Sequence, residues 1–443
     1  MKKINLLIAF MLSTLAGRGQ TALQYGFNAT TGTYTELASP TVLGSATTDS
    51  GATSLDDVSY RVTFPAGFSF NYLGTARTDL NIDSNGYVGF STIAWTSYTY
   101  APLSSNPSGG TNAGLISAFG ADLNAYSSAT SNPGSISWKV EGSGTDEVFV
   151  VQYKNFKPYE NLATVTRLLN FQIRLYESTH STKPNYVEIV YGNCVVGNAT
   201  STGVDVGIRN SATAWNANVN SVMQDDIPAG STCTWLNPVT SNNNTNGNYF
   251  STGNLAISIP NGLTYTWVPL SASAPLPVRT FAATASTPYT ITLNWTAPTG
   301  ATQYNVQYKV PGACTWTNFT GNPVSAATAT ITGLTADTAY QVRVQASNGT
   351  ENTIWSHIPN TVGSGNGYTA TGTISTQPTC FVPTAITASA ITNAAATVSW
   401  TAPTTVPSNG YEYYLSTTNT APVASTAGTA AASTSVNLST LTS

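Results

Sequence analysis

Charged residues are scarce in this chain. Asp, Glu, Lys and Arg together make up 8% of its 443 residues, against roughly 25% in an average soluble domain. The formal net charge is −4, so the chain lacks the basic face that binding to nucleic acid or to an anionic membrane requires. We therefore predict no nucleic-acid partner. The polar surface must instead be built from Thr, Ser, Asn and Gly, which favour strands and turns.

Histidine is almost absent, and this limits the possible chemistry. The two histidines, His180 and His357, lie in different predicted modules within polar, loop-like sequence, so a His-paired zinc site or a Ser-His-Asp triad would have to form across modules. The motifs HExxH and GxSxG do not occur. Glycoside hydrolysis needs only two carboxylates, and the candidates are Asp122, Glu147, Glu177 and Glu188. Glu188 alternates with apolar neighbours and is predicted to be a solvated strand residue. Because the chain also lacks a paired histidine site and these catalytic motifs, we predict neither enzyme activity nor a cofactor.

Long hydrophobic runs are also missing. The apolar run from Ile4 to Leu12 is far shorter than the roughly 20 residues needed to span a bilayer. It follows Lys2 and Lys3 and precedes small residues, which is the layout of a secretory signal peptide. We predict a cleaved signal peptide at residues 1–20, no membrane span, and a secreted or cell-surface location.

Cysteine is rare, with four residues in the chain. An even number in an exported protein permits two disulfides, and four cysteines allow three pairings. We favour Cys194 with Cys233 inside the first domain and Cys314 with Cys380 between the later modules. The alternative is four buried free thiols, because a chain of this length can build cores without disulfides.

What the chain does contain is a dense series of strand patterns. With 36 Gly and 23 Pro, the sequence predicts an all-β protein of short strands and tight turns. In residues 21–270, apolar alternation over 80–90 surrounds Asn85-Gly86, which predicts a hairpin with a type I′ turn. Further strands are predicted at 60–64, 68–72, 148–153, 169–177, 186–192 and 204–210. This head region is therefore predicted to be a two-sheet, jelly-roll-like β-sandwich.

Part of the head region resembles a known family. The succession of segments 116–124, 136–140, 148–156, 170–177 and 186–193 is similar to the nidogen-like β domain, and also to N-terminal sandwiches of large exported proteins of Bacteroidota. In the nidogen-like pattern an aromatic pair normally precedes the acid. Here the segment is Phe119-Gly120-Ala121-Asp122, which lacks the second aromatic residue.

An internal repeat marks the second half of the chain. The segment ITLNWTAPTG at 291–300 recurs as ATVSWTAPTT at 396–405. In the first copy Leu334 is followed six residues later by Tyr340, and residues 275–377 resemble a fibronectin type III module. The resemblance implies that Trp295 fills the core between two sheets and that Leu334 and Tyr340 form a tyrosine corner.

The second copy, residues 378–443, is predicted to be an incomplete module. Its landmarks are Trp400 and Leu441, and the sequence stops two residues after Leu441, before the strand that would carry the expected tyrosine. Resemblance to the first copy implies that the last strands are missing and that the sequence is a fragment of a longer protein.

Two sets of residues are candidates for ligand contact. Asp83 with Asn85, and Asp122 with Asn124, each offer a pair of oxygen ligands for calcium, which needs 6–8; turn chemistry is the alternative explanation for Asp83 and Asn85. The aromatic residues Trp95, Tyr98, Tyr100 and Trp215 lie in Ser-, Thr- and Asn-rich loops. Such residues stack on sugar rings or bind a protein partner, or else they plug the core beneath loops.

These observations favour a non-catalytic, exported binding or adhesion protein whose partner is an extracellular glycan or a surface protein. Fibronectin type III spacers would hold the head away from its attachment point. The alternative is the accessory N-terminal half of an exported hydrolase, a glycosidase or a protease, whose catalytic domain lies beyond Ser443. The sequence does not indicate an oligomeric state.

Overall fold

The structure is a computed structural model, and it describes most of the chain. The predicted signal peptide at residues 1–20 and the candidates Trp215, Cys233 and Cys380 lie outside the described residues. Within the described part, no helix has the length and apolar character needed to cross a membrane. The described residues are 21–48, 52–91, 93–103, 112–127, 133–159, 168–194, 204–210, 219–223, 235–241, 259–278, 280–358, 372–379, 382–403, 407, 410–418, 420–423 and 426–441.

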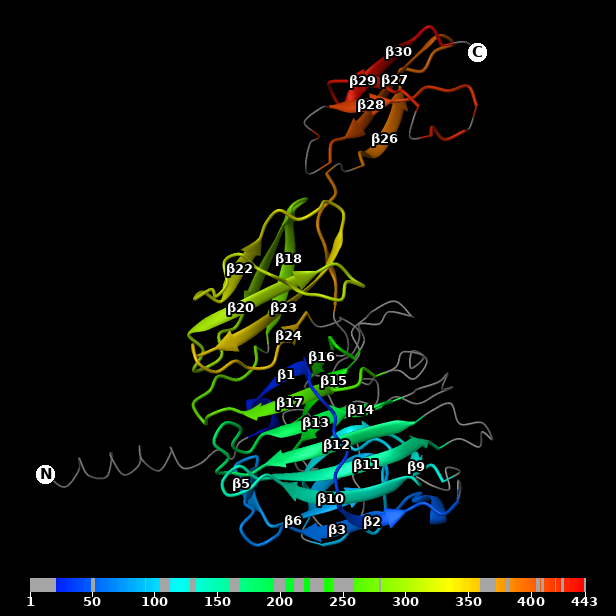
Figure 1. Cartoon of the computed structure of the whole chain (residues 1–443). Helices are drawn as coiled ribbons and strands as arrows, with labels where there is room; N and C mark the ends of the chain where they lie inside the picture. Colours follow the sequence, from blue (N-terminus) through cyan, green and yellow to red (C-terminus); the bar gives the residue numbers. More distant parts are fainter. Residues whose placement is uncertain are drawn as a thin grey trace, which may run out of the picture. The chain divides into compact units, whose positions relative to one another are not determined.

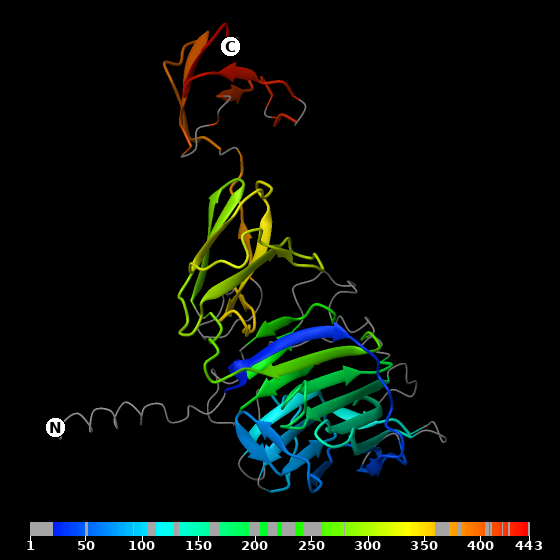
Figure 2. The ribbon, with the colours of Figure 1, turned by 60° about the vertical axis from the view of Figure 1, so that its left-hand side comes forward.

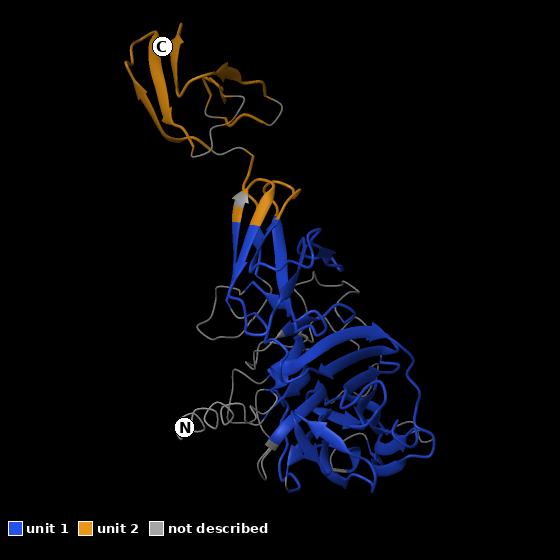
Figure 3. Ribbon diagram, turned by 90° about the vertical axis from the view of Figure 1, so that its left-hand side faces the viewer, with its two compact units in different colours: residues 1–284, 292–330, 339–374 blue, residues 285–291, 331–338, 375–443 orange. Residues whose placement is uncertain are grey.

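The fold is all-β, as the sequence predicts. Short 3-10 turns at Ala22–Gln24 and Ala52–Ser54 accompany thirty strands among the described residues. The chain forms two compact units, one made of residues 1–284, 292–330 and 339–374 and the other of residues 285–291, 331–338 and 375–443 (Figure 3).

Two sheets build the head region, which confirms the predicted two-sheet sandwich. Figure 1 shows most strands of sheet A side by side in their pairing order, and Figure 2 shows β1 beside β17, from opposite ends of the head sequence. Sheet A runs β1 (Tyr25–Thr31), β17 (Leu263–Pro269), β13 (Val187–Tyr191), β12 (Leu169–Tyr176), β11 (Val148–Pro158), β10 (Ser135–Glu141) and β2 (Thr41–Ser45), with β9 (Leu123–Ala125) pairing β11. Sheet B runs β16 (Val239–Ser241), β15 (Val219–Met223), β14 (Asp205–Arg209), β8 (Asn112–Gly120), β7 (Tyr87–Ser91), β6 (Asp79–Asp83) and β3 (Ser59–Thr63). A separate hairpin pairs β4 (Phe70–Tyr72) with β5 (Thr75–Arg77).

Alternation along the strands places one hydrophobic core between the two sheets. In β11, Phe149, Val151 and Tyr153 are fully buried in this core, because every second side chain of a strand points to the same face. Val88 and Ile116 contribute to the core from sheet B. Burial of apolar surface is the main force that holds the two layers together.

Tyrosine hydroxyl groups cross this core and bond to the backbone of the opposite sheet. The Tyr153 hydroxyl of β11 donates to the carbonyl oxygens of Asp83 at 2.7 Å and Tyr87 at 3.0 Å. The Tyr191 hydroxyl of β13 donates to the Ala118 carbonyl oxygen at 2.6 Å. A buried hydroxyl must find a partner, because leaving it without one costs about 1–3 kcal/mol. These bonds therefore fix how the two sheets lie on each other.

The predicted hairpin over residues 80–90 is confirmed, but its turn differs from the predicted type. Strands β6 and β7 pair through Asp83 and Tyr87, so three residues, Ser84, Asn85 and Gly86, connect them. Among these three only Gly86 has a positive φ, 80°, whereas a type I′ turn needs positive φ at both central residues. A Cβ at Gly86 would lie 2.2 Å from the Phe119 carbonyl oxygen, so close packing against β8 also requires glycine there.

Strands of the fibronectin-like region form two further sheets. Trp295 is buried, with its ring centroid 5.0 Å from that of Tyr304, and Leu334 and Tyr340 are also buried. One sheet runs β18 (Phe281–Thr287), β19 (Thr290–Trp295) and β22 (Thr328–Ile331). The other runs β21 (Thr317–Asn318), β20 (Gln303–Lys309), β23 (Ala339–Ser347) and β24 (Ser356–His357), with β25 (Ile374–Ser375) pairing β23.

The last part of the chain forms two small sheets. The rings of Trp400 and Tyr411 lie 5.4 Å apart, and the Leu441 backbone amide donates to the Ala394 carbonyl oxygen at 2.9 Å. That this module is incomplete stays a prediction. The sheets are β26 (Thr384–Ser389), β27 (Ala395–Thr401) and β30 (Ser435–Ser439), and β28 (Tyr411–Tyr413) with β29 (Thr429–Ala431).

The predicted disulfide between Cys194 and Cys233 is wrong. Cys194 is a buried free thiol whose Sγ donates to the Asn170 carbonyl oxygen at 3.2 Å. The head has a large core of its own, so it does not need a disulfide at this position. Cys314 is disulfide-bonded, but its pairing with Cys380 stays a prediction because Cys380 lies outside the described residues.

Burial should make the Cys194 thiol chemically inert in the folded protein. It raises the pKa of Cys194 to about 12, so the reactive thiolate is nearly absent at neutral pH. We expect iodoacetamide to leave Cys194 unmodified in the native protein and to alkylate it in 6 M guanidinium without a reductant, as read by peptide mass spectrometry. Alkylation that requires a reductant would show that Cys194 is in a disulfide after all.

Removal of the Tyr153 hydroxyl should weaken the head. In Tyr153→Phe the backbone oxygens of Asp83 and Tyr87 lose a buried donor, and we expect destabilisation of about 1–2 kcal/mol, measured as a lower melting temperature of the head transition by calorimetry. Tyr289→Phe is the matched control, because Tyr289 is 53% exposed. Equal melting temperatures for the two variants would contradict the role of the inter-sheet bond.

Candidate functional site

A loop of residues 93–103, here called the strap, covers part of the outer face of sheet B. Trp95 of the strap packs on Tyr87 and Leu115, which form a small buried cluster separate from the main core. The Thr99 backbone amide donates to the Tyr87 hydroxyl at 3.2 Å, and the Leu103 backbone amide donates to Asp205 Oδ2 at 3.0 Å. The strap is thus fixed at its beginning, middle and end.

Two tyrosines of the strap face solvent. Tyr98 is 42% exposed and Tyr100 is 43% exposed, with their ring centroids 5.5 Å apart and the ring planes tilted by 33°. Trp95, in contrast, is only 6% exposed, with its ring 5.5 Å from that of Tyr87. Of the aromatic candidates, Tyr98 and Tyr100 therefore remain available for stacking, and Trp95 is a core residue beneath the loop.

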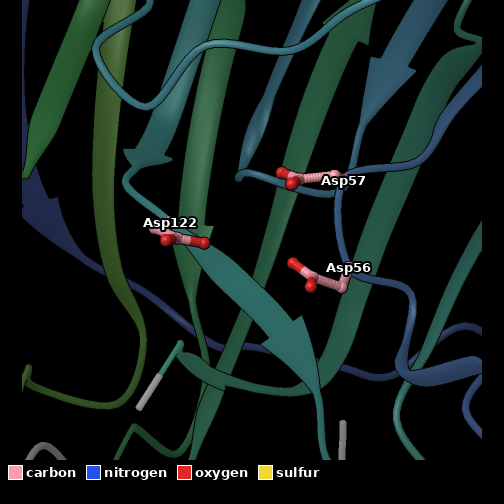
Figure 4. Close-up of side chains that lie close together, drawn as sticks. All are labelled: Asp56, Asp57 and Asp122. Carbon is pink, nitrogen blue, oxygen red and sulfur yellow. The ribbon is translucent and has the colours of Figure 1, made fainter. Parts of the chain in front are cut away.

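Three aspartates lie together near the Tyr98–Tyr100 pair. Asp56, Asp57 and Asp122 are partly buried, and one carboxylate oxygen from each lies within 4.8 Å of the others. Figure 4 shows Asp56 and Asp57, from the segment before β3, pointing toward Asp122, which precedes β9. We call these three residues the Asp cluster. Carboxylates are the oxygen ligands that calcium prefers, but three of them are fewer than the 6–8 oxygens of a full site.

Asn85 in the β6–β7 turn holds the two sides of the Asp cluster in place. Its side-chain Nδ2 donates to Asp57 Oδ1 at 3.1 Å, and its Oδ1 accepts the Leu123 backbone amide at 2.9 Å. Asp57 has φ of 54°, a conformation that Asp and Asn tolerate better than most residues. The buried amide of Asn85 thus sets the distance between segments that are far apart in sequence.

Burial and mutual repulsion shift the ionisation of the cluster. The pKa of Asp122 is raised to about 6, mainly by burial and then by the charges of Asp57 and Asp56. Burial and Asp57 also raise the pKa of Asp56, against an opposing effect of Lys157. The pKa of Tyr100 is raised by burial and by the charges of Asp122 and Asp57. The phenol of Tyr100 therefore lies beside the same carboxylates, so the aromatic pair and the acids form one site.

This site offers two kinds of contact to a ligand. The exposed phenol rings present flat apolar faces with a polar tip, and ionised carboxylates accept strong hydrogen bonds from hydroxyl or ammonium groups.

The oxygen pairs predicted for calcium do not come together as one site. Asp83 and Asn85 are fully buried, and the Asn85 backbone amide donates to Asp83 Oδ1 at 3.0 Å, so turn chemistry accounts for this pair. Asn124 is 1% exposed in β9. Only Asp122 joins the Asp cluster.

Sequence reasoning missed Asp56 and Asp57. The adjacent Asp-Asp pair before a strand was visible in the sequence, but its nearness to Asp122 depends on the way β3 and β9 are brought together in the sandwich. A local motif does not encode a contact of that kind.

The hydrolase candidate Glu188 is on the outer face of its strand, as expected, but it is not solvated. It is 5% exposed because Tyr176 donates to its Oε2 at 2.5 Å and Lys183 Nζ lies 2.7 Å from its Oε1. The expectation of a loop position for His357 is also wrong, since it is buried in β24.

Removal of one charge should relax the Asp cluster. In Asp57→Asn the amide keeps the Oδ1 acceptor for Asn85 and tolerates the positive φ, while the repulsion on Asp122 falls. We expect the pKa of Asp122 to fall by roughly 0.5–1 unit, measured by NMR titration of its carboxyl carbon. Asp146→Asn, an exposed position, is the control. An unchanged Asp122 pKa in Asp57→Asn would show that burial alone raises it.

Two protein-family models match this chain, and both agree with its all-β fold. The family described as "NIDO related" matches residues 24–269, and the fibronectin type III domain family matches residues 276–361. Similar solved structures include a two-domain fibronectin type III segment of chicken tenascin, with 22% identity over 38% of this chain and 84% of that chain and a TM-score of 0.20. Another is the sixth fibronectin type III domain of human fibronectin type III domain containing protein 3, with 18% identity over 26% of this chain and 96% of that chain and a TM-score of 0.19.

No curated protein matches the chain. The second half contains a fibronectin type III domain, and such domains together with NIDO-related ones are typical of modular extracellular proteins. Because the NIDO-related match covers more than half of the sequence, this chain belongs to the NIDO-related family.

Proposed function

We propose that this chain is an exported, non-catalytic binding protein whose head takes a glycan or a surface-protein ligand at the Tyr98–Tyr100 pair and the Asp cluster. Its signal peptide directs export, and its fibronectin type III region is a spacer. The observation that carries the proposal is the exposure of two neighbouring tyrosine rings, each about 40% exposed, beside carboxylates on an otherwise weakly charged chain.

The chemistry of the site favours a glycan. The C–H face of a sugar ring packs on an aromatic face, and its hydroxyl groups donate to carboxylates. The low charge of the chain suits such a ligand, because a neutral sugar is recognised through hydrogen bonds and stacking instead of through long-range electrostatic attraction.

The rigid support of the site also favours binding. The strap is fixed by the hydrogen bonds of Thr99 and Leu103, and Asn85 fixes the Asp cluster. A site that is preorganised in this way loses less conformational entropy when a ligand binds.

A glycan array probed with the full chain tests this function. We expect retention of a restricted set of glycans, and we expect Tyr98→Ala and Tyr100→Ala each to weaken binding roughly two- to tenfold, the effect of losing one stacked aromatic contact worth about 0.5–1.5 kcal/mol. Tyr289→Ala, at an exposed tyrosine of the fibronectin type III region, is the matched control and should bind normally.

Two results would contradict the proposed ligand site. If no glycan is retained, and no surface protein binds in a Tyr100-dependent way, the head has only a structural role. If the Tyr98 and Tyr100 variants bind as well as the control does, the ligand site is elsewhere.

A further inference from the structure

Two buried acids lie beneath the strap on the outer face of sheet B. Asp83 at the end of β6 is 0% exposed, and Asp205 at the start of β14 is 5% exposed. Each is close to a strap anchor, because Asp205 accepts the Leu103 amide and Asp83 pairs across the hairpin with Tyr87, whose hydroxyl accepts the Thr99 amide. Two ionisable groups therefore lie close to the hydrogen bonds that anchor the strap, which carries Tyr98 and Tyr100.

Asp205 has few groups to stabilise its negative charge. Its Oδ2 accepts the Leu103 amide at 3.0 Å, and the Arg209 guanidinium of the same strand attracts it. Burial nevertheless outweighs both effects and raises the pKa of Asp205 to about 7.

Asp83 is still less able to hold a charge. Its Oδ1 accepts the Asn85 amide at 3.0 Å, and among the described residues no hydrogen-bond partner lies within 3.5 Å of its buried Oδ2. Burial raises the pKa of Asp83 to about 8; the Asn85 amide and the nearby Tyr87 hydroxyl act to lower this pKa, and the charge of Asp57 acts to raise it.

Among the described residues, few other titratable groups surround these acids. The groups facing Asp83 are Tyr87 of β7, Tyr153 of β11 and Asp57 before β3. Those near Asp205 and Arg209 are Tyr72 of β4 and Tyr87. The phenols stay neutral because burial raises their pKa values, whereas the raised pKa values of Asp83 and Asp205 lie near neutral pH. Asp122 beside Tyr100 has a pKa raised to about 6, so it titrates mostly below the range of pH 6 to pH 8 in which Asp83 and Asp205 ionise.

We propose that the strap is a pH-sensitive gate on the candidate site: ionisation of Asp83 and Asp205 beneath it opens the strap and moves Tyr98 and Tyr100 away from Asp122. The role of this gate in ligand binding rests on the function proposed above. Its physical basis is the cost of a buried charge, which is relieved when an open strap admits water to the carboxylates.

The two raised pKa values determine whether the strap opens at low or at high pH. In the closed state the acids stay protonated up to about pH 7 and pH 8, whereas in water they would ionise near pH 4. A raised folded-state pKa contributes stability at low pH that is lost as pH rises through that pKa. The strap is therefore most firmly closed in mildly acidic solution, and it opens increasingly as pH rises until about pH 8, where the effect levels off.

Hydrogen exchange of the full chain tests the gate without any ligand. The opening equilibrium of the peptide over residues 93–103 is measured from pH 5 to pH 9, after correction for the intrinsic exchange rate. We expect the equilibrium constant for opening to rise about tenfold or more between pH 6 and pH 8. Each acid that is protonated in the closed state and ionised in the open state raises this constant by up to tenfold per pH unit. Asp83→Asn combined with Asp205→Asn should reduce the rise to less than about twofold, and Asp146→Asn should leave it unchanged.

A peptide from β11, in the centre of sheet A, provides the reference for global unfolding. Exchange that rises with pH in the strap but not in β11 supports the gate. Exchange that is flat with pH, that rises equally in the two peptides, or that keeps its full pH dependence in the double variant overturns it. If the glycan array retains no glycan, only the role of the strap in ligand binding is overturned. Failure of the gate and failure of the proposed function are therefore distinguishable.

Discussion

The hydrogen bonds between tyrosine hydroxyls and backbone carbonyls across the core fix the arrangement on which the rest of the head depends. A sandwich held together by apolar contacts alone can slide, because the hydrophobic effect is not directional. Tyr153 and Tyr191 bond from sheet A to residues 83, 87 and 118 of sheet B, and a hydrogen bond weakens steeply when its geometry is lost. In a chain with 8% charged residues, these neutral bonds set the register between the two sheets.

The candidate site follows from that register. Tyr153 holds the ends of the β6–β7 hairpin, and the hairpin turn presents Asn85, which links Asp57 to the start of β9 beside Asp122. The strap is tied to the outer face of the same hairpin through the Tyr87 hydroxyl. One rigid hairpin thus supports the aromatic pair and the acids, although they come from segments that are distant in sequence.

Much of the fold was predictable because the strands follow from local sequence patterns. Alternation of apolar and polar residues located β11, β12 and β13, and Trp295 marked the buried strand of the fibronectin type III region. The failures have a common cause. Cys194 reads as half of a disulfide and His357 as a loop residue, yet both are buried, because no local pattern reports which surface the rest of the fold covers. For Trp95 the sequence left open a ligand contact or a core residue beneath a loop, and the structure shows the second.

The sequence by itself determined that the chain is all-β and modular, because strand period, turn residues and the repeated WTAP segment are properties of short stretches. The tertiary structure decided which carboxylates meet. Asp56 and Asp57 lie beside Asp122, and Asp83 lies beneath the strap instead of in the cluster. These outcomes depend on strand order and inter-sheet register, which arise from contacts summed over the whole core, and the same burial then sets the ionisation of each acid.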